Sequence, residues 1–297
     1  MQSNRDVRRI ADLLHHGIFL FDSVGIDAPQ TEAELVVTHC LELSRTDLYL
    51  RAQEQISRVQ ADRCLAMMQR RSENEPLAYI TGEREFWSYT FNVSPAVLIP
   101  RPETEILIER VLAARDCSNA GGGYLDLCCG SGVIAIVLAL ELDVEVIGVD
   151  ISRPALKVCR SNCARHGVEQ RVHLVQGDLA SCFAENEQFS LITCNPPYVS
   201  SSEMAAGMQP EVAKYEPILA LDGGPGGLNH ISRVIATFSS LLAPGGYFFM
   251  EIGAGQGGAV KELLARSDSD DLYASIDIIK DYSGRDRVVQ VRKNDQY

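Results

Sequence analysis

Residues 124–140 read YLDLCCGSGVIAIVLAL: a short apolar strand, a glycine-containing turn and an apolar helix. Strand-like and helical segments alternate through most of the chain that follows, and this alternation predicts an α/β fold with a doubly wound, mostly parallel sheet. Ligands bind such sheets at the carboxyl ends of the strands, near the point where the strand order reverses. We expect strands at 124–127, 144–150, 172–176, 191–194, 247–252, 273–279 and 288–291, and helices at 133–140, 154–166, 228–242 and 257–266.

The first 75 residues have a helical pattern instead. Apolar residues from Ala33 to Leu41 recur at the spacing of a half-buried helix, and Thr31 and Glu34 have the spacing of a capping box at its start. Aromatic and β-branched residues between 86 and 98 then predict one or two hairpins. We therefore predict a helical bundle domain at 1–75, a β-hairpin linker at 76–98 and the α/β domain at 99–297.

Composition excludes several classes of protein. The 297 residues carry a formal net charge of −13, which disfavours general affinity for nucleic acid. Apolar runs are too short to cross a bilayer, and the N-terminus around Arg5, Arg8 and Arg9 has no apolar core of a secretory signal. Nine cysteines without paired CxxC spacing indicate reduced thiols. We expect a cytoplasmic protein.

Three successive predicted strands end in residues suited to a nucleoside. The turn Cys128-Cys129-Gly130-Ser131-Gly132 lacks the G-x-G-x-x-G dinucleotide motif, although its glycines let a ligand approach the backbone. Asp150 ends the next strand, where a carboxylate can accept hydrogen bonds from both ribose hydroxyls. Asp178 and Leu179 follow the third strand and can bind the amino group and ring of adenine. Each feature alone is equally a simple turn or helix cap, but together they predict a site for S-adenosylmethionine (SAM).

The fourth predicted strand ends in Asn195-Pro196-Pro197-Tyr198. A planar NH2 group is a poor nucleophile because its lone pair is delocalised. The Asn195 side-chain oxygen and the Pro196 carbonyl can accept its two hydrogens and leave the lone pair free to meet a methyl group, while the prolines stiffen the turn. Tyr198 can stack on the flat face of the substrate. We predict these four residues as catalytic and substrate-binding, in a direct displacement without a covalent intermediate.

These residues resemble the PrmC/HemK family, the glutamine N5-methyltransferases of peptide chain release factors. The resemblance covers nearly the whole chain, and Leu98–Glu105 (LIPRPETE) is its narrowest signature. The other segments that carry it are Pro76–Gly82, Glu85–Trp87, Asn195–Tyr198, Tyr215–Pro217, Glu251–Gly253 and Asp281–Val288.

The resemblance implies a Rossmann-like SAM-dependent methyltransferase domain, a helical domain that recognises the substrate and a hairpin linker. The substrate implied is the glutamine of the Gly-Gly-Gln motif in class 1 release factors, with S-adenosylhomocysteine as the second product. The implied cofactor contacts are Cys128–Gly132, Asp150, Leu179 and Asn195. Because the family often has glycine where Cys128 stands, the backbone angle at Cys128 is in question.

Two charged residues have two interpretations each. Arg101 either closes a loop over the substrate or pairs with a surface carboxylate, and Glu251 either lines the site or only neighbours the start of a helix. The six histidines are scattered without ligand spacing, so we expect no metal site.

Two other classes of function remain open at this stage. A SAM-dependent amino-methyltransferase acting on adenine or guanine would share Asn-Pro-Pro-Tyr, but it needs a large basic surface that the sequence lacks. A module that binds SAM or a release factor without turnover is the other alternative. We expect a monomer with no nucleic-acid partner.

Overall fold

The computed structural model describes residues 9–114, 122–184, 188–268 and 271–296, and the N-terminal residues 1–8 lie outside this range. The chain forms two compact units, one of residues 1–82 and 209–215 and one of residues 83–208 and 216–297. The hairpin belongs to the second unit. The domain boundaries at 75 and 98 stay predictions.

The first unit is helical, and its core is formed where three helices pack together. α1 (Ile10–Ser23), α2 (Pro29–Leu41) and α4 (Arg58–Ser72) bury residues such as Leu13, Val36 and Met68. The shorter helices are α3 (Arg45–Leu50), α5 (Leu77–Thr81) and α10 (Pro210–Tyr215). Arg71 on α4 is almost buried and pairs with Glu32 at 2.8 Å and with Glu211 of α10 at 3.0 Å, which joins the two parts of this unit.

The predicted capping box at Thr31 is wrong. α2 begins at Pro29, with Ala28 at its N-cap, so Thr31 lies inside the first turn. Proline has a φ angle suited to the first helical position and no N–H to leave unpaired there, which explains the earlier start. Glu34 instead lies buried and accepts hydrogen bonds from Arg45 and Tyr49.

The second unit opens with one hairpin. β1 (Glu83–Phe86) pairs with β2 (Tyr89–Asn92) in antiparallel register across Trp87 and Ser88. Both turn residues have positive φ, 52° and 61°, as a two-residue turn that matches the twist of its strands requires. α6 (Thr104–Ala113) follows.

A seven-stranded sheet in the order β5-β4-β3-β6-β7-β9-β8 forms the centre of this unit. β3 (Gly123–Leu127), β4 (Val146–Asp150), β5 (Val172–Gln176), β6 (Phe189–Cys194) and β7 (Leu242–Glu251) are parallel, whereas β9 (Asp286–Lys293) runs antiparallel to β7 and to β8 (Tyr273–Lys280). This confirms the predicted doubly wound, mostly parallel sheet.

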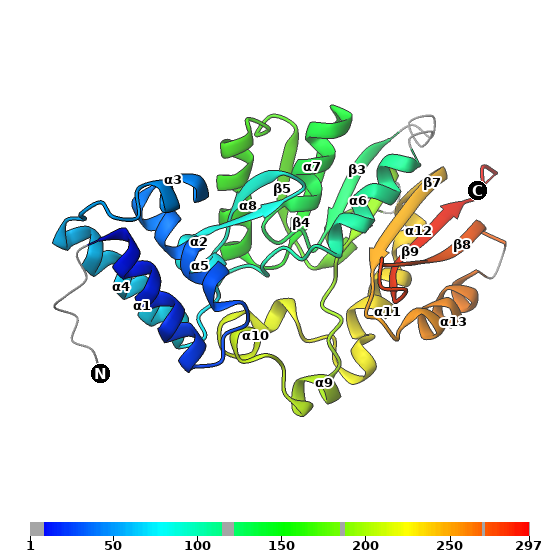
Figure 1. Ribbon diagram of the computed structural model, residues 1–297. Helices are drawn as coiled ribbons and strands as arrows, with labels where there is room; N and C mark the ends of the chain where they lie inside the picture. The colour runs from blue at the N-terminus through cyan, green and yellow to red at the C-terminus, as the bar shows by residue number, and fades with distance from the viewer. Residues whose placement is uncertain (1–8, 115–121, 185–187, 269–270, 297) are drawn as a thin grey trace. The chain divides into compact units, whose positions relative to one another are not determined.

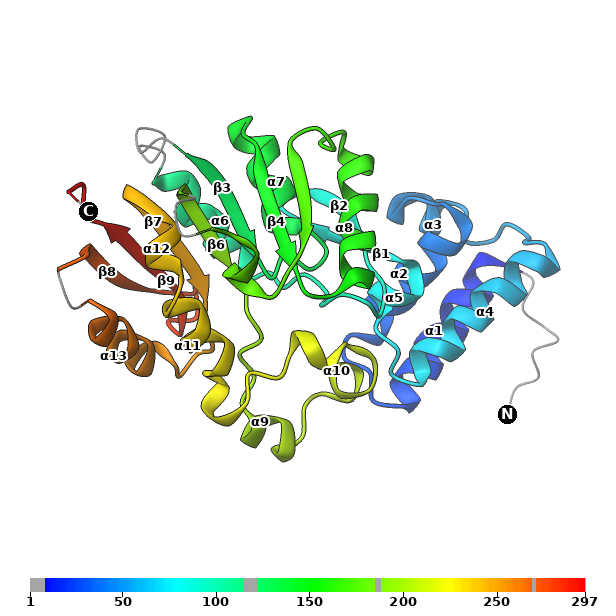
Figure 2. The ribbon, with the colours of Figure 1, turned by 180° about the vertical axis from the view of Figure 1, so that it is seen from behind.

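Helices cover both faces of the sheet (Figures 1 and 2). α6, α7 (Val133–Leu142) and α8 (Arg153–His166) pack on one face, and α11 (Asn229–Ile235), α12 (Phe238–Leu241) and α13 (Gly257–Ser267) pack on the other. Burial on both faces explains why β6 is apolar or small along its whole length. The remaining short elements are η2 (Leu179–Cys182), α9 (Ser201–Ala206), η3 (Ile218–Ala220) and η4 (Pro225–Gly227).

The predicted single helix at 228–242 is broken into α11 and α12. The Thr237 hydroxyl donates to the carbonyls of Arg233 and Val234, and Phe238 stacks on Phe248 of β7 at a ring-centroid distance of 4.1 Å. Leu242 then starts β7 opposite Phe189. Packing against the sheet therefore interrupts a helix that the apolar spacing alone would continue.

Burial of Asp126 in the sheet makes the stability of the protein depend on pH. Its carboxyl is fully buried on β3, it accepts a hydrogen bond from Thr193 at 2.8 Å, and desolvation raises its pKa to about 7. Between about pH 4 and pH 7, Asp126 is protonated in the folded state but ionised in the unfolded state. The free energy of unfolding therefore falls as the pH rises through this range.

We expect Asp126→Asn to stabilise the protein more at about pH 8 than at about pH 5, by roughly 2 kcal/mol. Denaturant unfolding at the two pH values measures this difference, with Asp277→Asn on the exposed side of β8 as the control. An equal effect of Asp126→Asn at both pH values would contradict the raised pKa.

Candidate active site

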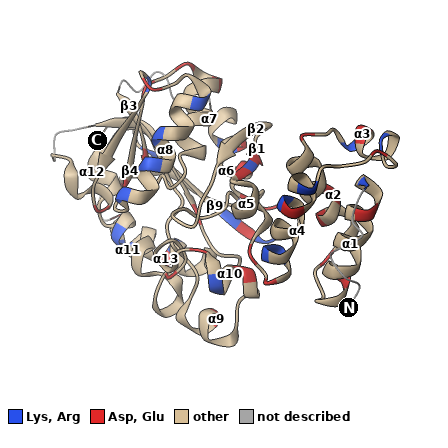
Figure 3. Cartoon of the chain, turned by 90° about the vertical axis from the view of Figure 1, so that its left-hand side faces the viewer, with Lys and Arg blue, Asp and Glu red and all other residues tan. Residues whose placement is uncertain are grey.

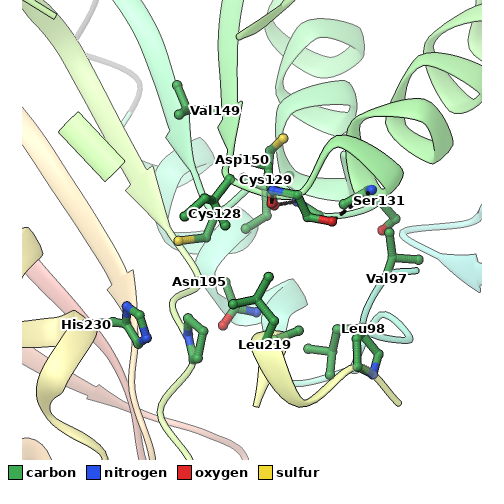
Figure 4. Close-up of a pocket in the computed structure, with 18 of the residues that line it drawn as sticks. Val97, Leu98, Cys128, Cys129, Ser131, Val149, Asp150, Asn195, Leu219 and His230 are labelled. Carbon is green, nitrogen blue, oxygen red and sulfur yellow. Dashed lines mark hydrogen bonds between the residues drawn. The ribbon is translucent and has the colours of Figure 1, made fainter. Parts of the chain in front are cut away.

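A cavity of about 180 Å³ lies at the carboxyl ends of the parallel strands. In sheet order, the segments that line it follow β5, β4, β3 and β6, and the strand order reverses at β3. Figure 4 shows Cys128, Cys129, Ser131 and Asp150 along one side and Asn195, Leu219 and Leu98 along the opposite side. This is the position at which doubly wound sheets bind ligands.

The turn after β3 is held in place by its neighbour β4. Cys129 N–H donates to the Val149 carbonyl at 3.0 Å, and Gly130 N–H donates to Asp150 Oδ2 at 2.8 Å. Cys128 has a φ of +58°, a conformation in which glycine is the ordinary residue, so this turn carries backbone strain at the cavity wall.

The two glycines of this turn have different functions. Gly130 lines the cavity, and a Cβ there would have no neighbour closer than 3.9 Å. Gly132 does not line it; a Cβ at Gly132 would lie 2.3 Å from Cys159 Sγ on α8. Gly130 therefore leaves room for a ligand, whereas Gly132 is required for the packing of α7 against α8.

Asp150 is partly buried at the tip of β4. Its Oδ1 accepts from Ser152 N–H at 2.8 Å and its Oδ2 accepts from Gly130 N–H. Burial raises the pKa of this carboxyl, while the two N–H groups act in the opposite direction. Each oxygen has a further lone pair, so the carboxylate can still accept hydrogen bonds from two vicinal hydroxyls.

Asp178 and Leu179, which follow β5, both line the cavity. Asp178 is paired with Arg233 of α11 at 2.6 Å. Leu179 adopts a φ of +53°, which is strained for this residue type and turns the chain into η2. Their proposed contacts with adenine stay predictions.

Only part of Asn195–Tyr198 lines the cavity. Asn195 and Pro197 do, whereas Pro196 is buried and Tyr198 is not among the lining residues. The Tyr198 hydroxyl donates to Oε1 of the fully buried Glu251 at 2.8 Å, and burial raises the pKa of the phenol. Stacking of Tyr198 on the substrate stays a prediction. Glu251 itself does not line the cavity.

The backbone after Tyr198 is held by close contacts. Gln256 Nε2 donates to the carbonyls of Tyr198 at 2.9 Å and Gly226 at 3.0 Å, and its Oε1 accepts from Gly253 N–H at 2.7 Å. Gly227 packs directly on the same backbone, since a Cβ there would lie 2.0 Å from the Tyr198 carbonyl oxygen. The Asn-Pro-Pro-Tyr turn is therefore held at Tyr198 by two residues that do not line the cavity.

Arg101 lines the cavity but forms an ion pair with Glu216 at 2.5 Å. The side chain of Glu216 is 1% exposed, and its second oxygen accepts from Ile99 N–H at 3.2 Å. The structure therefore shows Arg101 paired with a carboxylate, although this carboxylate is buried and not on the surface. A contact between Arg101 and the substrate stays a prediction.

The lining suits a nucleoside that carries a flexible alkyl chain. Val97, Leu98, Ile134, Val149 and Leu219 provide apolar surface, and Asp150 provides a carboxylate for hydroxyl groups. The residues present therefore fit SAM. Among the described residues, no group of three or more His, Cys, Asp and Glu side chains is arranged to hold a metal ion. None of the described helices is long and apolar enough to span a membrane.

The sequence interpretation missed several residues of the site. Thr104, Arg233 and His230 line the cavity, and Gln256 supports it from outside. Thr104 could have been found from the sequence, because it belongs to the LIPRPETE signature. The other three residues stand in segments without a distinctive motif.

Comparison with known proteins identifies the family. Residues 12–82 match the PrmC N-terminal domain family, and residues 118–275 match a methyltransferase domain family. The release factor glutamine methyltransferase of Nitratidesulfovibrio vulgaris is 36% identical to this chain over 283 residues, 95% of the chain and 94% of that relative. The chain belongs to the release factor glutamine methyltransferase family.

A second release factor glutamine methyltransferase, from Thermodesulfovibrio yellowstonii, is 38% identical over 265 residues, 89% of this chain and 92% of that relative. Among solved structures, the hMettl16 catalytic domain in complex with MAT2A 3'UTR hairpin 1 is similar at a TM-score of 0.55, with 14% identity over 91% of this chain and 92% of that chain. This likeness concerns the fold alone. The resemblance predicted from the sequence motifs is confirmed.

The glycines after the motif allow a controlled test of how its backbone is held. Gly226 and Gly227 have similar φ angles, +63° and +71°, but a Cβ at Gly226 meets nothing closer than 3.8 Å. We expect Gly227→Ala to lower kcat and the thermal midpoint well beyond the effect of Gly226→Ala, whose backbone strain costs about 1–3 kcal/mol. Equal effects of the two variants would show that the contact with Tyr198 does not matter.

Proposed function

We propose that this chain transfers a methyl group from SAM to the side-chain amide nitrogen, N5, of the glutamine in the Gly-Gly-Gln motif of class 1 release factors. Family membership supports the reaction. The observation that carries it for this chain is the position of Asn195, which lines one cavity together with Asp150 and Gly130.

SAM supplies an electrophilic methyl group when it is bound. Asp150 is proposed to hold the ribose hydroxyls, with Leu179 and Val149 against the adenine. Asn195 Oδ1 and the Pro196 carbonyl are proposed to accept the two amide hydrogens of the substrate glutamine and to hold its nitrogen facing the methyl. Such positioning can lower a barrier by roughly 7–11 kcal/mol. Positive charge that develops on the nitrogen is stabilised by these two acceptors. The nitrogen gains the methyl group and then loses one of its two hydrogens as a proton to solvent, and S-adenosylhomocysteine is the other product.

Charge distribution favours a protein substrate over nucleic acid. The chain carries a net charge of −13, and its Lys and Arg residues are spread over elements of both units, α4, α8 and α10 among them (Figure 3). Affinity for duplexes requires basic residues concentrated on one surface. We propose a monomeric enzyme of the cytoplasm, where a release factor is available, without a nucleic-acid partner.

Labelled SAM tests the proposed reaction directly. Purified protein is incubated with a class 1 release factor, with a form of it whose motif glutamine is replaced by alanine, and with duplex DNA. We expect label only in the unaltered release factor, and mass spectrometry of its tryptic peptides should place the methyl on the motif glutamine. Label in DNA alone would support the base-methylating alternative, and label in none would indicate a binding module.

Asn195→Ala separates binding from turnover. Removal of the side-chain oxygen should lower kcat by about 100-fold or more, the scale seen when a charge-stabilising group is removed from an active site. The Kd for SAM should change far less, because Asp150 and the glycine turn remain. Calorimetric titration with SAM alongside the turnover assay measures both, and equal losses would contradict the role of Asn195.

A further inference from the structure

Glu251 at the end of β7 lies between two hydroxyl groups. Its Oε1 accepts from the Tyr198 hydroxyl at 2.8 Å and its Oε2 accepts from Thr104 Oγ1 at 2.6 Å. Glu251 is fully buried and Thr104 is 2% exposed, so the hydrogen bond between them is shielded from bulk solvent. When Glu251 is ionised it can only accept, so both hydroxyls donate to it, as the two hydrogen bonds are arranged here.

The direction of these hydrogen bonds determines whether the Thr104 hydroxyl donates to Asn195 or accepts from it. A hydroxyl has one proton, and Thr104 has given it to Glu251, so toward any other group it is an acceptor. Asn195 Nδ2 lies 3.4 Å from Thr104 Oγ1, a long contact. The opposite amide orientation would place Asn195 Oδ1 against Thr104 Oγ1 with no proton between them. Hydrogen-bond polarity therefore favours the orientation with Asn195 Nδ2 toward Thr104, which the structure has.

We propose that Thr104 and Glu251 are positioning residues that orient the Asn195 side-chain amide with its oxygen toward the cavity. This inference rests on the proposed function and deepens it. Within the described residues, no group donates a hydrogen bond to Asn195 Oδ1, and Asn195 and Thr104 both line the cavity. The oxygen is thus left free for an N–H of the substrate amide, and its orientation is set before the substrate binds.

The same carboxylate also holds the far end of the motif. The Tyr198 hydroxyl donates to Glu251 directly, and Asn195 is linked to Glu251 through Thr104. Both ends of Asn195–Tyr198 are therefore connected to the same buried carboxyl group. Burial raises the pKa of Glu251 above its usual value, with a smaller contribution from the negative charge of Glu103; the hydrogen bonds from Thr104 and Tyr198 and the charge of Arg287 oppose this shift. Arg287 is itself paired with Asp281 at 3.3 Å.

Two substitutions of Thr104 provide the first test. Thr104→Val keeps the shape and removes the hydroxyl, so the Asn195 amide is free to turn; Thr104→Ser keeps the hydroxyl. We expect Thr104→Val to lower kcat by about 10- to 100-fold, with the Kd for SAM within about twofold of the parent. Thr104→Ser should restore kcat to within about threefold of the parent. A parental kcat in Thr104→Val, or no recovery in Thr104→Ser, would overturn the positioning role.

Glu251→Gln tests the polarity itself. A glutamine can donate its NH2 to Thr104, which then turns its proton toward Asn195 and draws the amide oxygen out of the cavity. We expect kcat to fall at least as far as in Thr104→Val, although the size of the side chain is unchanged. Glu103→Gln removes a nearby exposed negative charge without touching these hydrogen bonds and should keep the parental kcat. Equal kcat values for Glu251→Gln and Glu103→Gln would refute the proposed relay.

Nitrogen-15 NMR of the side-chain amides reads the orientation independently of turnover. The Asn195 NH2 signals, assigned by their loss in Asn195→Asp, should shift and exchange faster with water in Thr104→Val but not in Thr104→Ser. If the parent shows these signals but methylates no release factor, the proposed function fails while the orientation of Asn195 stands. If the parent methylates and Thr104→Val changes neither the signals nor kcat, the positioning role fails alone.

Discussion

Parallel pairing of β3 with β4 on one side and β6 on the other is the constraint on which the site depends. Because the three strands run in the same direction, their carboxyl ends meet at one edge. The chain continues from β3 to β4 on one side and from β6 to β7 on the other, so the strand order reverses between β3 and β6. A crevice forms at this reversal. The glycine turn, Asp150 and Asn195 follow or end these three strands, so the pairing places a carboxylate and an amide side chain around one cavity.

The Asn-Pro-Pro-Tyr turn is held by groups that do not line the cavity. Glu251 accepts a hydrogen bond from the Tyr198 hydroxyl, Gln256 donates to the Tyr198 carbonyl, and Gly227 permits the two backbone segments to approach closely. An acceptor that must meet a planar amide gains from such fixation, because a mobile carbonyl would have to be oriented anew in each turnover. The buried Glu251, which would be costly without partners, is hydrogen-bonded through both of its oxygens.

Sequence patterns predicted regular strands better than helix ends. The strand at 172–176 has the bounds that its apolar residues indicate, and the turn of Cys128–Gly132 lies where the pattern places it. The predicted capping box of α2 is wrong because the fixed φ of Pro29 favours an earlier helix start. The break between α11 and α12 accompanies the stacking of Phe238 on Phe248. Both errors come from local spacing that neglects the backbone or the tertiary contacts.

The sequence by itself determined the order of strands and helices, the chemistry at each strand end and the family, because these depend on residues close together in the chain. Only the tertiary structure decided which of them meet. Thr104 pairs with Asn195 across 91 positions and with Glu251 across 147. Periodicity contains no information about such pairs, since they form only after the sheet has brought β6 and β7 side by side and α6 has packed against its face.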